Sequence, residues 1–243
     1  MYIKIIEKLI QVMYRIIGVG YGSGSIKKEV ESVKKLIGEG SVFVDCGGNI
    51  GNYSSEILRV FPNSNLHIFE PSKHNIQILD SKFKNKKNVI INGVGLSNVN
   101  DESTLFSDKS GSGLGSLTKR RLDHFNIDFD FNEKIKLVRL DEYWNENIKS
   151  EYIDLVKIDV EGHEIQVLEG LGEKIKNVRS IQFEFGGCNI DTKTYFQDFW
   201  YFFKNHNFTI FRISPLGIIE INKYKELYES FTTTNFICTN NNL

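Results

Sequence analysis

Two polar segments of this 243-residue chain have residue types and spacings that suit chemistry. The first is residues 45–51, DCGGNIG, in which glycines allow the backbone to turn tightly and to approach a ligand without a Cβ clash. The second is residues 157–164, KIDVEGHE, which is dense in ionisable side chains. Carboxylates and an imidazole in such a segment can hold a cationic group or accept a proton.

The elements around these segments must place them on a common surface. Short apolar runs predict strands at residues 41–45, 66–70, 89–96, 135–140, 154–159 and 180–185. Helical patterns lie between them at 52–60, 72–83, 164–171 and 194–206. This alternation predicts an α/β fold, a mostly parallel sheet with helices on both faces. The runs 208–213, 218–221 and 236–238 are expected to complete the sheet with a C-terminal antiparallel hairpin.

In an open parallel sheet, ligands bind beyond the carboxyl ends of the strands, where both polar segments fall. Glu70 ends the second predicted strand, 19 residues after Gly51. A carboxylate at this place can accept hydrogen bonds from both ribose hydroxyls of an adenosine. The glycine loop and Glu70 together predict a nucleoside-type cofactor. A helix cap beside a surface acid is the plainer alternative.

The charge pattern distinguishes between nucleosides. The dinucleotide fingerprint G-x-G-x-x-G is absent, Asn49 stands where a second glycine would admit a pyrophosphate, and Asp45 would repel phosphates. S-adenosylmethionine has no phosphate, and a carboxylate attracts its sulfonium and ammonium groups. We therefore favour S-adenosylmethionine over NAD. A nicotinamide-dependent reductase or epimerase, and a non-catalytic nucleoside-binding module, are the alternatives.

Several motifs follow one another in a recognisable order: residues 44–51, 69–71 (FEP), 92–97, 139–141 (RLD), 157–164 and 167–170 (VLEG). Over roughly residues 40 to 240, their order and spacing resemble the FkbM family of S-adenosylmethionine-dependent methyltransferases. The resemblance implies a Rossmann-like class I methyltransferase fold and, usually, O-methylation of sugars, polyketides or similar metabolites. It also implies cofactor contacts at Asp45, Gly47, Asn49, Gly51 and Glu70.

Together, these arguments predict a cofactor site made by Asp45, Gly47, Gly48, Asn49, Gly51, Asn52, Glu70, Pro71 and Val94. The candidate catalytic residues are Asp159, Glu161 and His163. Methyl transfer is an in-line displacement that needs alignment and exclusion of water, and a hydroxyl acceptor also benefits from a base, but no metal is predicted. Asp159 or Glu161 would orient the acceptor or the methionine ammonium, and His163 would accept the proton. A solvent-facing histidine in a first helical turn fits the same position equally well.

Residues 101–136 interrupt the alternating pattern. The segment is long, contains several glycines and lies between two strand ends, so we expect a lid or acceptor site there. The basic run 119–121, KRR, can hold a phosphate or an acidic sugar, although a solvated surface is the favoured interpretation.

The N-terminus is expected to be a helical segment at 1–38 ahead of a methyltransferase domain at 39–243. Apolar residues recur at helical spacing in the first twenty positions, and charged residues interrupt them too regularly for a membrane span. Because the polar side of this helix mixes charge signs, a role in covering the core or in a homodimer contact is favoured over a membrane-surface helix.

The composition of the chain limits which classes of binding partner and which cellular compartment are expected. A formal net charge of −1 argues against a nucleic-acid partner. Three widely spaced cysteines without a C-x-x-C motif indicate a reducing cytoplasm and give no zinc signal. We expect a cytoplasmic enzyme with a small-molecule or saccharide acceptor.

Overall fold

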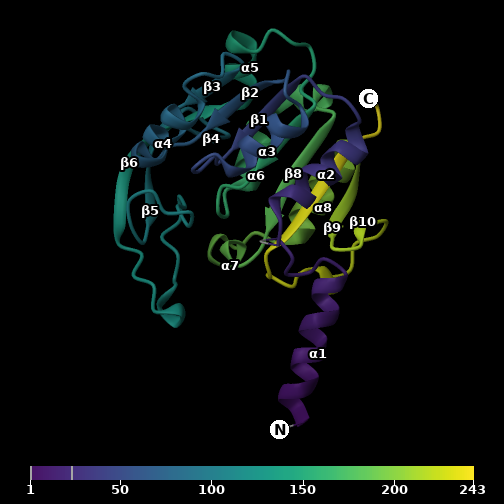
Figure 1. Ribbon diagram of the computed structural model, residues 1–243. Coiled ribbons are helices and arrows are strands. Elements are labelled where there is room, and N and C mark those ends of the chain that lie inside the picture. Colours follow the sequence, from purple (N-terminus) through teal and green to yellow (C-terminus); the bar gives the residue numbers. More distant parts are fainter. Residues whose placement is uncertain (1, 23) are drawn as a thin grey trace.

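A computed structural model describes residues 2–22 and 24–243 (Figure 1). Within this part of the chain, the main sheet has the strand order β10-β9-β11-β8-β7-β1-β2-β3. Its central strands β1 (Val42–Cys46), β2 (Asn65–Phe69), β3 (Val89–Asn92), β7 (Leu155–Ile158) and β8 (Ser180–Phe185) are parallel. The parallel sheet predicted from the alternating pattern is therefore confirmed.

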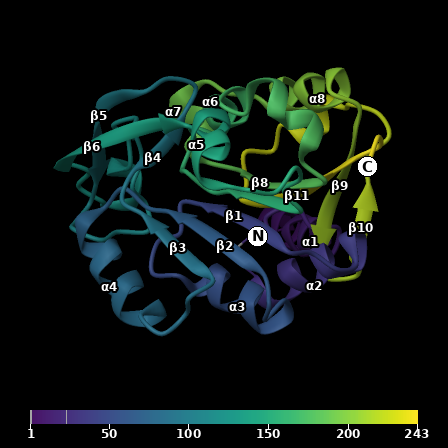
Figure 2. The ribbon, with the colours of Figure 1, turned by 90° about the horizontal axis from the view of Figure 1, so that it is seen from above.

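Helices cover both faces of this sheet (Figure 2). One face carries α2 (Ile26–Ile37), α3 (Asn52–Val60) and α4 (Lys73–Phe83), and the other carries α5 (Leu140–Asn147), α6 (Glu164–Glu169) and α8 (Phe196–Asn205). Alternate residues of a strand point to opposite faces, so Val44 packs in one of two hydrophobic cores and Phe43 in the other. The same alternation decides which side chains of β1 can reach the site.

The last strands form the expected antiparallel edge. β9 (Phe208–Ser214) and β10 (Gly217–Glu220) make a hairpin, and β11 (Thr234–Asn240) lies antiparallel between β8 and β9. The aromatic helix α8 packs on this edge, where the Phe199 ring stacks on Phe183 with centroids 4.5 Å apart. The aromatic side chains of α8 thus belong mainly to the core.

Residues 101–136 are more regular than the sequence indicates. β5 (Asp101–Ser107) and β6 (Phe131–Arg139) pair antiparallel, and β4 (Gly95–Ser97) adds a parallel edge to form a second sheet. The predicted strand 89–96 is consequently two strands, and Leu140 starts α5 instead of ending a strand. β5 and the start of β6 lack the apolar pattern that predicts a strand, because they are mostly polar. Only Leu105, Ile135 and Leu137 form the buried cluster of this small sheet.

Helix α1 (Tyr2–Ile16) projects away from the body (Figure 1). None of its residues is buried, so the expectation that it covers the core of this chain is wrong. Its apolar residues instead face outward, and a homodimer contact stays a prediction. In the part of the chain that the structure describes, no helix is long and apolar enough to cross a membrane.

Candidate active site

The glycine loop joins the ends of three adjacent strands. Gly47 and Gly48 donate backbone hydrogen bonds of 2.9 and 3.0 Å to the Phe69 carbonyl at the end of β2. Gly47 has φ +83°, and a Cβ there would lie 1.9 Å from the Asp159 carbonyl beyond β7. Only glycine fits this position, because both the backbone conformation and the close approach exclude a side chain. The loop therefore holds β1, β2 and the β7 end in one fixed arrangement.

Glu70 is fixed beside this loop. Its Oε2 accepts a 2.7 Å hydrogen bond from the Asn49 N–H, and its Oε1 accepts one of 2.9 Å from the Ser72 N–H. Burial raises the pKa of Glu70, although these hydrogen bonds oppose the increase. The carboxylate is thus oriented by backbone donors and keeps lone pairs for a ligand.

A main pocket opens in front of these residues. It brings together six of the predicted site residues, namely Gly47, Glu70, Pro71, Asp159, Glu161 and His163. The small sheet contributes apolar lining residues, among them Leu105 and Ile135, and the β5–β6 connection contributes Ser112, Gly113 and Gly115. The pocket is therefore polar at the strand ends and largely apolar opposite them, a combination typical of small-molecule sites.

A buried cation organises the acids behind the loop. Lys157 Nζ lies 2.6 Å from Asp159 Oδ2 and 5.1 Å from the centroid of the Tyr53 ring. Burial disfavours the lysine charge, but the carboxylates of Asp159, Asp45 and Glu29 outweigh it and raise the pKa of Lys157. Lys157 thus balances several acids that would otherwise repel one another.

Glu161 occupies the boundary between two pockets. Its backbone has φ +53°, and its Oε2 lies 2.7 Å from Arg120 Nη1. The Nε atom of Arg120 lies 3.5 Å from Asp191 Oδ2. Burial, together with Asp159, raises the pKa of Glu161 to about 8 despite the Arg120 charge. Burial, together with Asp159 and Glu161, raises the pKa of Glu184 to about 9. Both carboxyls therefore hold a proton more readily than an exposed carboxyl does.

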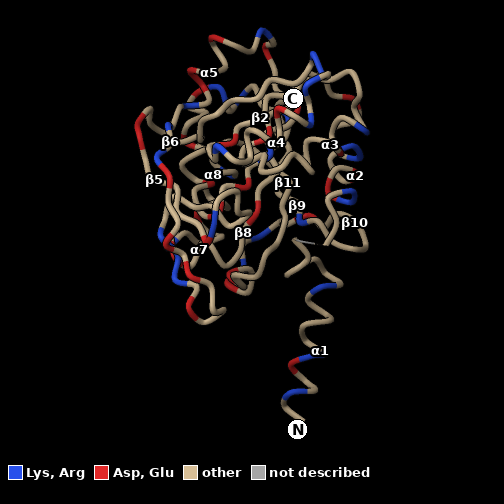
Figure 3. Tube along the Cα trace, turned by 60° about the vertical axis from the view of Figure 1, so that its left-hand side comes forward, with Lys and Arg blue, Asp and Glu red and all other residues tan. Residues whose placement is uncertain are grey.

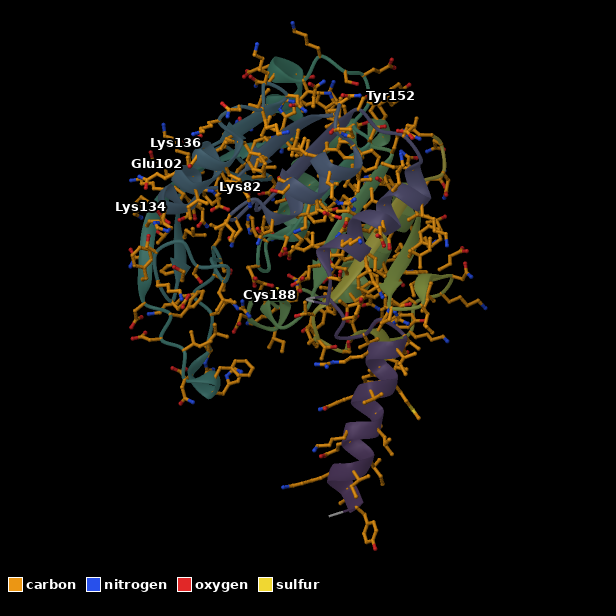
Figure 4. All side chains as sticks on the ribbon, in the orientation of Figure 1. Lys82, Glu102, Lys134, Lys136, Tyr152 and Cys188 are labelled. Carbon is orange, nitrogen blue, oxygen red and sulfur yellow. The ribbon has the colours of Figure 1, made fainter. Side chains whose placement is uncertain are left out.

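An outer pocket lies on the far side of Glu161. Its walls include Arg120, Glu184 and side chains of the β5–β6 connection, and α1 supplies Gln11, Tyr14 and Arg15. Cys188, at the start of α7 (Cys188–Thr192), also lines it and lies at the lower end of the body (Figure 4). Because Glu161 lines both pockets, a group in one can approach a group in the other at this residue.

His163 lies in the main pocket with its Nε2 3.0 Å from Ser97 Oγ. Burial lowers the pKa of His163 to about 4, so the imidazole is neutral at neutral pH. It is therefore partly buried and a weaker proton acceptor than its residue type implies. Glu164, next in the chain, closes the turn by accepting a 2.9 Å hydrogen bond from the Gly162 N–H.

Some predicted cofactor residues lie outside the main pocket. Asp45 points toward α3, where its Oδ2 accepts a 2.6 Å hydrogen bond from Ser54, because strand alternation places it on that face. Gly51 packs against Phe83 in α4. Val94 lines a separate hollow and packs on the core.

Gly48, Asn49 and Asn52 line a further hollow behind the glycine loop. The Asn52 amide oxygen accepts a 3.1 Å hydrogen bond from Lys82 Nζ. Glu29 and Lys157 line the same hollow. Direct contacts of these loop residues with a cofactor remain predictions.

Sequence reasoning missed several polar residues of the site. The favoured solvated interpretation of residues 119–121 is wrong for Arg120, whose side chain is only 10% exposed and carries the ion pairs described above. Glu184 was detectable, as a lone acid in the apolar strand SIQFEF. Glu29 gave no signal, since an acid in the first turn of a helix is commonplace.

Comparison with known proteins places this chain in a family. Residues 45–210 match the profile described as the Methyltransferase FkbM domain. Methyltransferase 1 of Beauveria bassiana (strain ARSEF 2860) is 24% identical over 179 residues, which cover 63% of this chain and 72% of that protein.

A crystal structure of methyltransferase FkbM from Methylobacillus flagellatus KT has a similar fold, with a TM-score of 0.50 at 14% identity. The similarity covers 82% of this chain but only 43% of that protein, so the chain spans less than half of its length. The main sheet, with helices on both faces, is the Rossmann-like class I methyltransferase fold. Because the family profile matches more than half of the sequence, this chain belongs to the FkbM methyltransferase family.

Proposed function

We propose that the chain is an S-adenosylmethionine-dependent O-methyltransferase that acts on a hydroxyl group of a sugar, a glycan-linked group or a similar small metabolite. The observation that carries this proposal is the main pocket, in which the Gly47 loop, Glu70 and the Asp159–Glu161 turn meet at neighbouring strand ends. Strand ends of this kind hold nucleoside cofactors in open parallel sheets.

Buried polar atoms beside Glu70 fit an adenosine. Within the described residues, Ser72 Oγ and Asn75 Oδ1 are buried and have no hydrogen-bond partner, although both residues donate other hydrogen bonds to Glu70. Buried polar atoms normally have hydrogen-bond partners, so these two atoms are expected to bind a ligand or a water molecule. Both lie beside Glu70, which lines the main pocket and offers acceptors for ribose hydroxyls.

The acids of the pocket fit a cationic cofactor. S-adenosylmethionine, when bound, supplies a methyl group on a positively charged sulfur. Asp159 and Glu161 line the pocket in which this charge would lie, and ionised carboxylates stabilise it. Such a cofactor would give its methyl group to the acceptor oxygen as the sulfur–methyl bond breaks and S-adenosylhomocysteine leaves, and the oxygen would lose its proton. Glu161 is the residue that we assign to receive this proton, because it lines both pockets and has a pKa of about 8.

S-adenosylmethionine is expected to bind more tightly as the pH rises toward about 8. Below this pH the Glu161 carboxyl of the free protein is protonated, since its pKa is about 8. A cationic ligand favours the ionised form, so binding lowers this pKa and releases a proton. The affinity therefore rises by up to about tenfold per pH unit and levels off above pH 8. Calorimetric titration in two buffers of different ionisation enthalpy measures the released proton.

The matched variant is Glu161→Gln, which keeps the size of the side chain and removes its titration. We expect this variant to bind with a flatter pH profile and to release fewer protons. An unchanged profile would assign the proton to another group, and Glu184 would be the next to test.

The reaction itself is tested with methyl-labelled S-adenosylmethionine and pools of sugars, glycans and small metabolites. Mass spectrometry should find one added methyl group on a hydroxyl oxygen, and the product should be absent with Asp159→Asn. Labelled methyl on nitrogen or on a carboxylate would contradict O-methylation of a hydroxyl, while labelled cofactor binding without product would limit the protein to binding.

A further inference from the structure

Helix α1 carries an apolar surface that no other described part of the chain covers. Its large apolar side chains are 44% to 77% exposed: Tyr2, Ile3, Ile5, Ile6, Leu9, Ile10, Val12, Met13 and Ile16. Exposed apolar surfaces of this extent mark sites of association. These nine exposed apolar side chains therefore suit a partner outside the body of the protein.

The width of this surface favours a lipid bilayer as the partner. At about 100° of rotation per residue, the apolar side chains span about 180° of the helix circumference, with Met13 and Ile6 near the centre. A single partner helix covers a narrower seam of a and d positions. A lipid bilayer covers about half of a helix that lies in its surface.

The charges on the opposite side agree with a lipid surface. The polar arc mixes charge signs, which disfavoured a membrane role on sequence alone, but Lys4, Lys8 and Arg15 outnumber the single acid Glu7 (Figure 3). A net positive arc favours anionic headgroups, and each basic residue near such a surface contributes about 1 kcal/mol. We propose that α1 docks on the surface of an anionic lipid bilayer, with its apolar half in the headgroup–acyl boundary.

The base of the helix is attached firmly to the body. The Gly22 N–H donates a 2.9 Å hydrogen bond to the Thr233 carbonyl, and the Asn235 side chain donates one of 2.8 Å to the Gly22 carbonyl. Val19 is buried, and a Cβ on Gly18 would lie 2.2 Å from the Ile213 carbonyl oxygen. Docking of α1 therefore fixes the position of the body relative to the bilayer.

The outer pocket lies on the polar side of α1. Gln11 and Arg15, both on the polar arc, line this pocket, which leaves the apolar half free for lipid. The β5–β6 connection and α7 lie at the end of the body from which α1 projects (Figure 1). The docked protein would open its outer pocket beside the membrane.

Vesicle co-sedimentation of the full chain tests the proposal. Vesicles of phosphatidylcholine containing phosphatidylglycerol should bind the protein, and pure phosphatidylcholine should bind it more weakly. The double variant Ile6→Glu/Met13→Glu should bind at least about tenfold more weakly, because two apolar side chains leave the interface. Lys4→Gln/Lys8→Gln should lose mainly the preference for anionic lipid.

The matched control is Val99→Glu, since Val99 is 48% exposed and lies outside α1. Val99→Glu should bind vesicles like the unaltered protein. Both α1 variants should have the melting temperature of the unaltered protein, because none of the described residues of α1 is buried. Equal binding by Ile6→Glu/Met13→Glu and by the unaltered protein would overturn the proposal. An absence of vesicle binding would also overturn it. If sedimentation velocity then showed a dimer that Ile6→Glu/Met13→Glu dissociates, α1 would be a dimer contact instead.

Discussion

Replacing Glu70 by glutamine is expected to weaken S-adenosylhomocysteine binding by about tenfold to a hundredfold. A hydrogen bond to a charged group contributes about 1.5–3 kcal/mol, and the change removes the charge while it keeps the shape. The Glu70 carboxylate is oriented by the Asn49 and Ser72 backbone N–H groups at 2.7 and 2.9 Å, so a ligand meets a fixed acceptor. Isothermal titration calorimetry gives the two dissociation constants.

Glu102→Gln serves as the matched control for this change. Glu102 is an exposed carboxylate on the outer side of β5 (Figure 4), and its replacement should leave the affinity unchanged. Equal affinities of Glu70→Gln and the unaltered protein would show that the ribose lies elsewhere. Circular dichroism verifies that both variants remain folded.

Replacing Lys157 by methionine is expected to have the largest effect on stability, a loss of about 3–5 kcal/mol in the free energy of unfolding. Methionine keeps the length of the side chain and removes the charge that Asp159 Oδ2 approaches at 2.6 Å. Asp45 and Glu29 also lose the cation that offsets their burial. Urea unfolding at neutral pH measures the loss.

The loss of stability caused by Lys157→Met should depend on pH. Lys157 lowers the pKa values of Asp45 and Glu29, so its removal raises them further, and acid conditions neutralise these two carboxyls. The deficit relative to the unaltered protein should therefore shrink as the pH falls. Lys136→Met is the control, since Lys136 is exposed on β6 (Figure 4) and should change stability by no more than about 0.5 kcal/mol. A deficit that is independent of pH would contradict a charge-balancing role.

The central strands and their helices were predictable because their apolar periodicity is strong. The range of α3 follows from glycine and proline boundaries, and that of β8 from an apolar run that only Glu184 and Gln182 interrupt. The same logic failed for β5, whose polar residues show no alternation and whose partner β6 is distant in sequence. Pairing between remote polar strands leaves little local signal.

The site was predictable where the backbone determines it. Gly47, Glu70 and Asp159 follow strand ends, so their proximity follows from a parallel sheet. Asp45 shows the limit, because its place in the motif does not reveal that its side chain points toward α3. Arg120 shows a second limit, because only its tertiary contact with Glu161 distinguishes a buried ion pair from a charge on the surface.

The proposed cofactor site is tested most directly by a crystal structure of the protein with S-adenosylhomocysteine. The adenosine is predicted to lie in the main pocket, with a ribose hydroxyl within hydrogen-bonding distance of the Glu70 carboxylate. Its homocysteine part should extend toward Asp159 and Glu161. A ligand bound outside this pocket, or a ribose without contact to Glu70, would contradict the account.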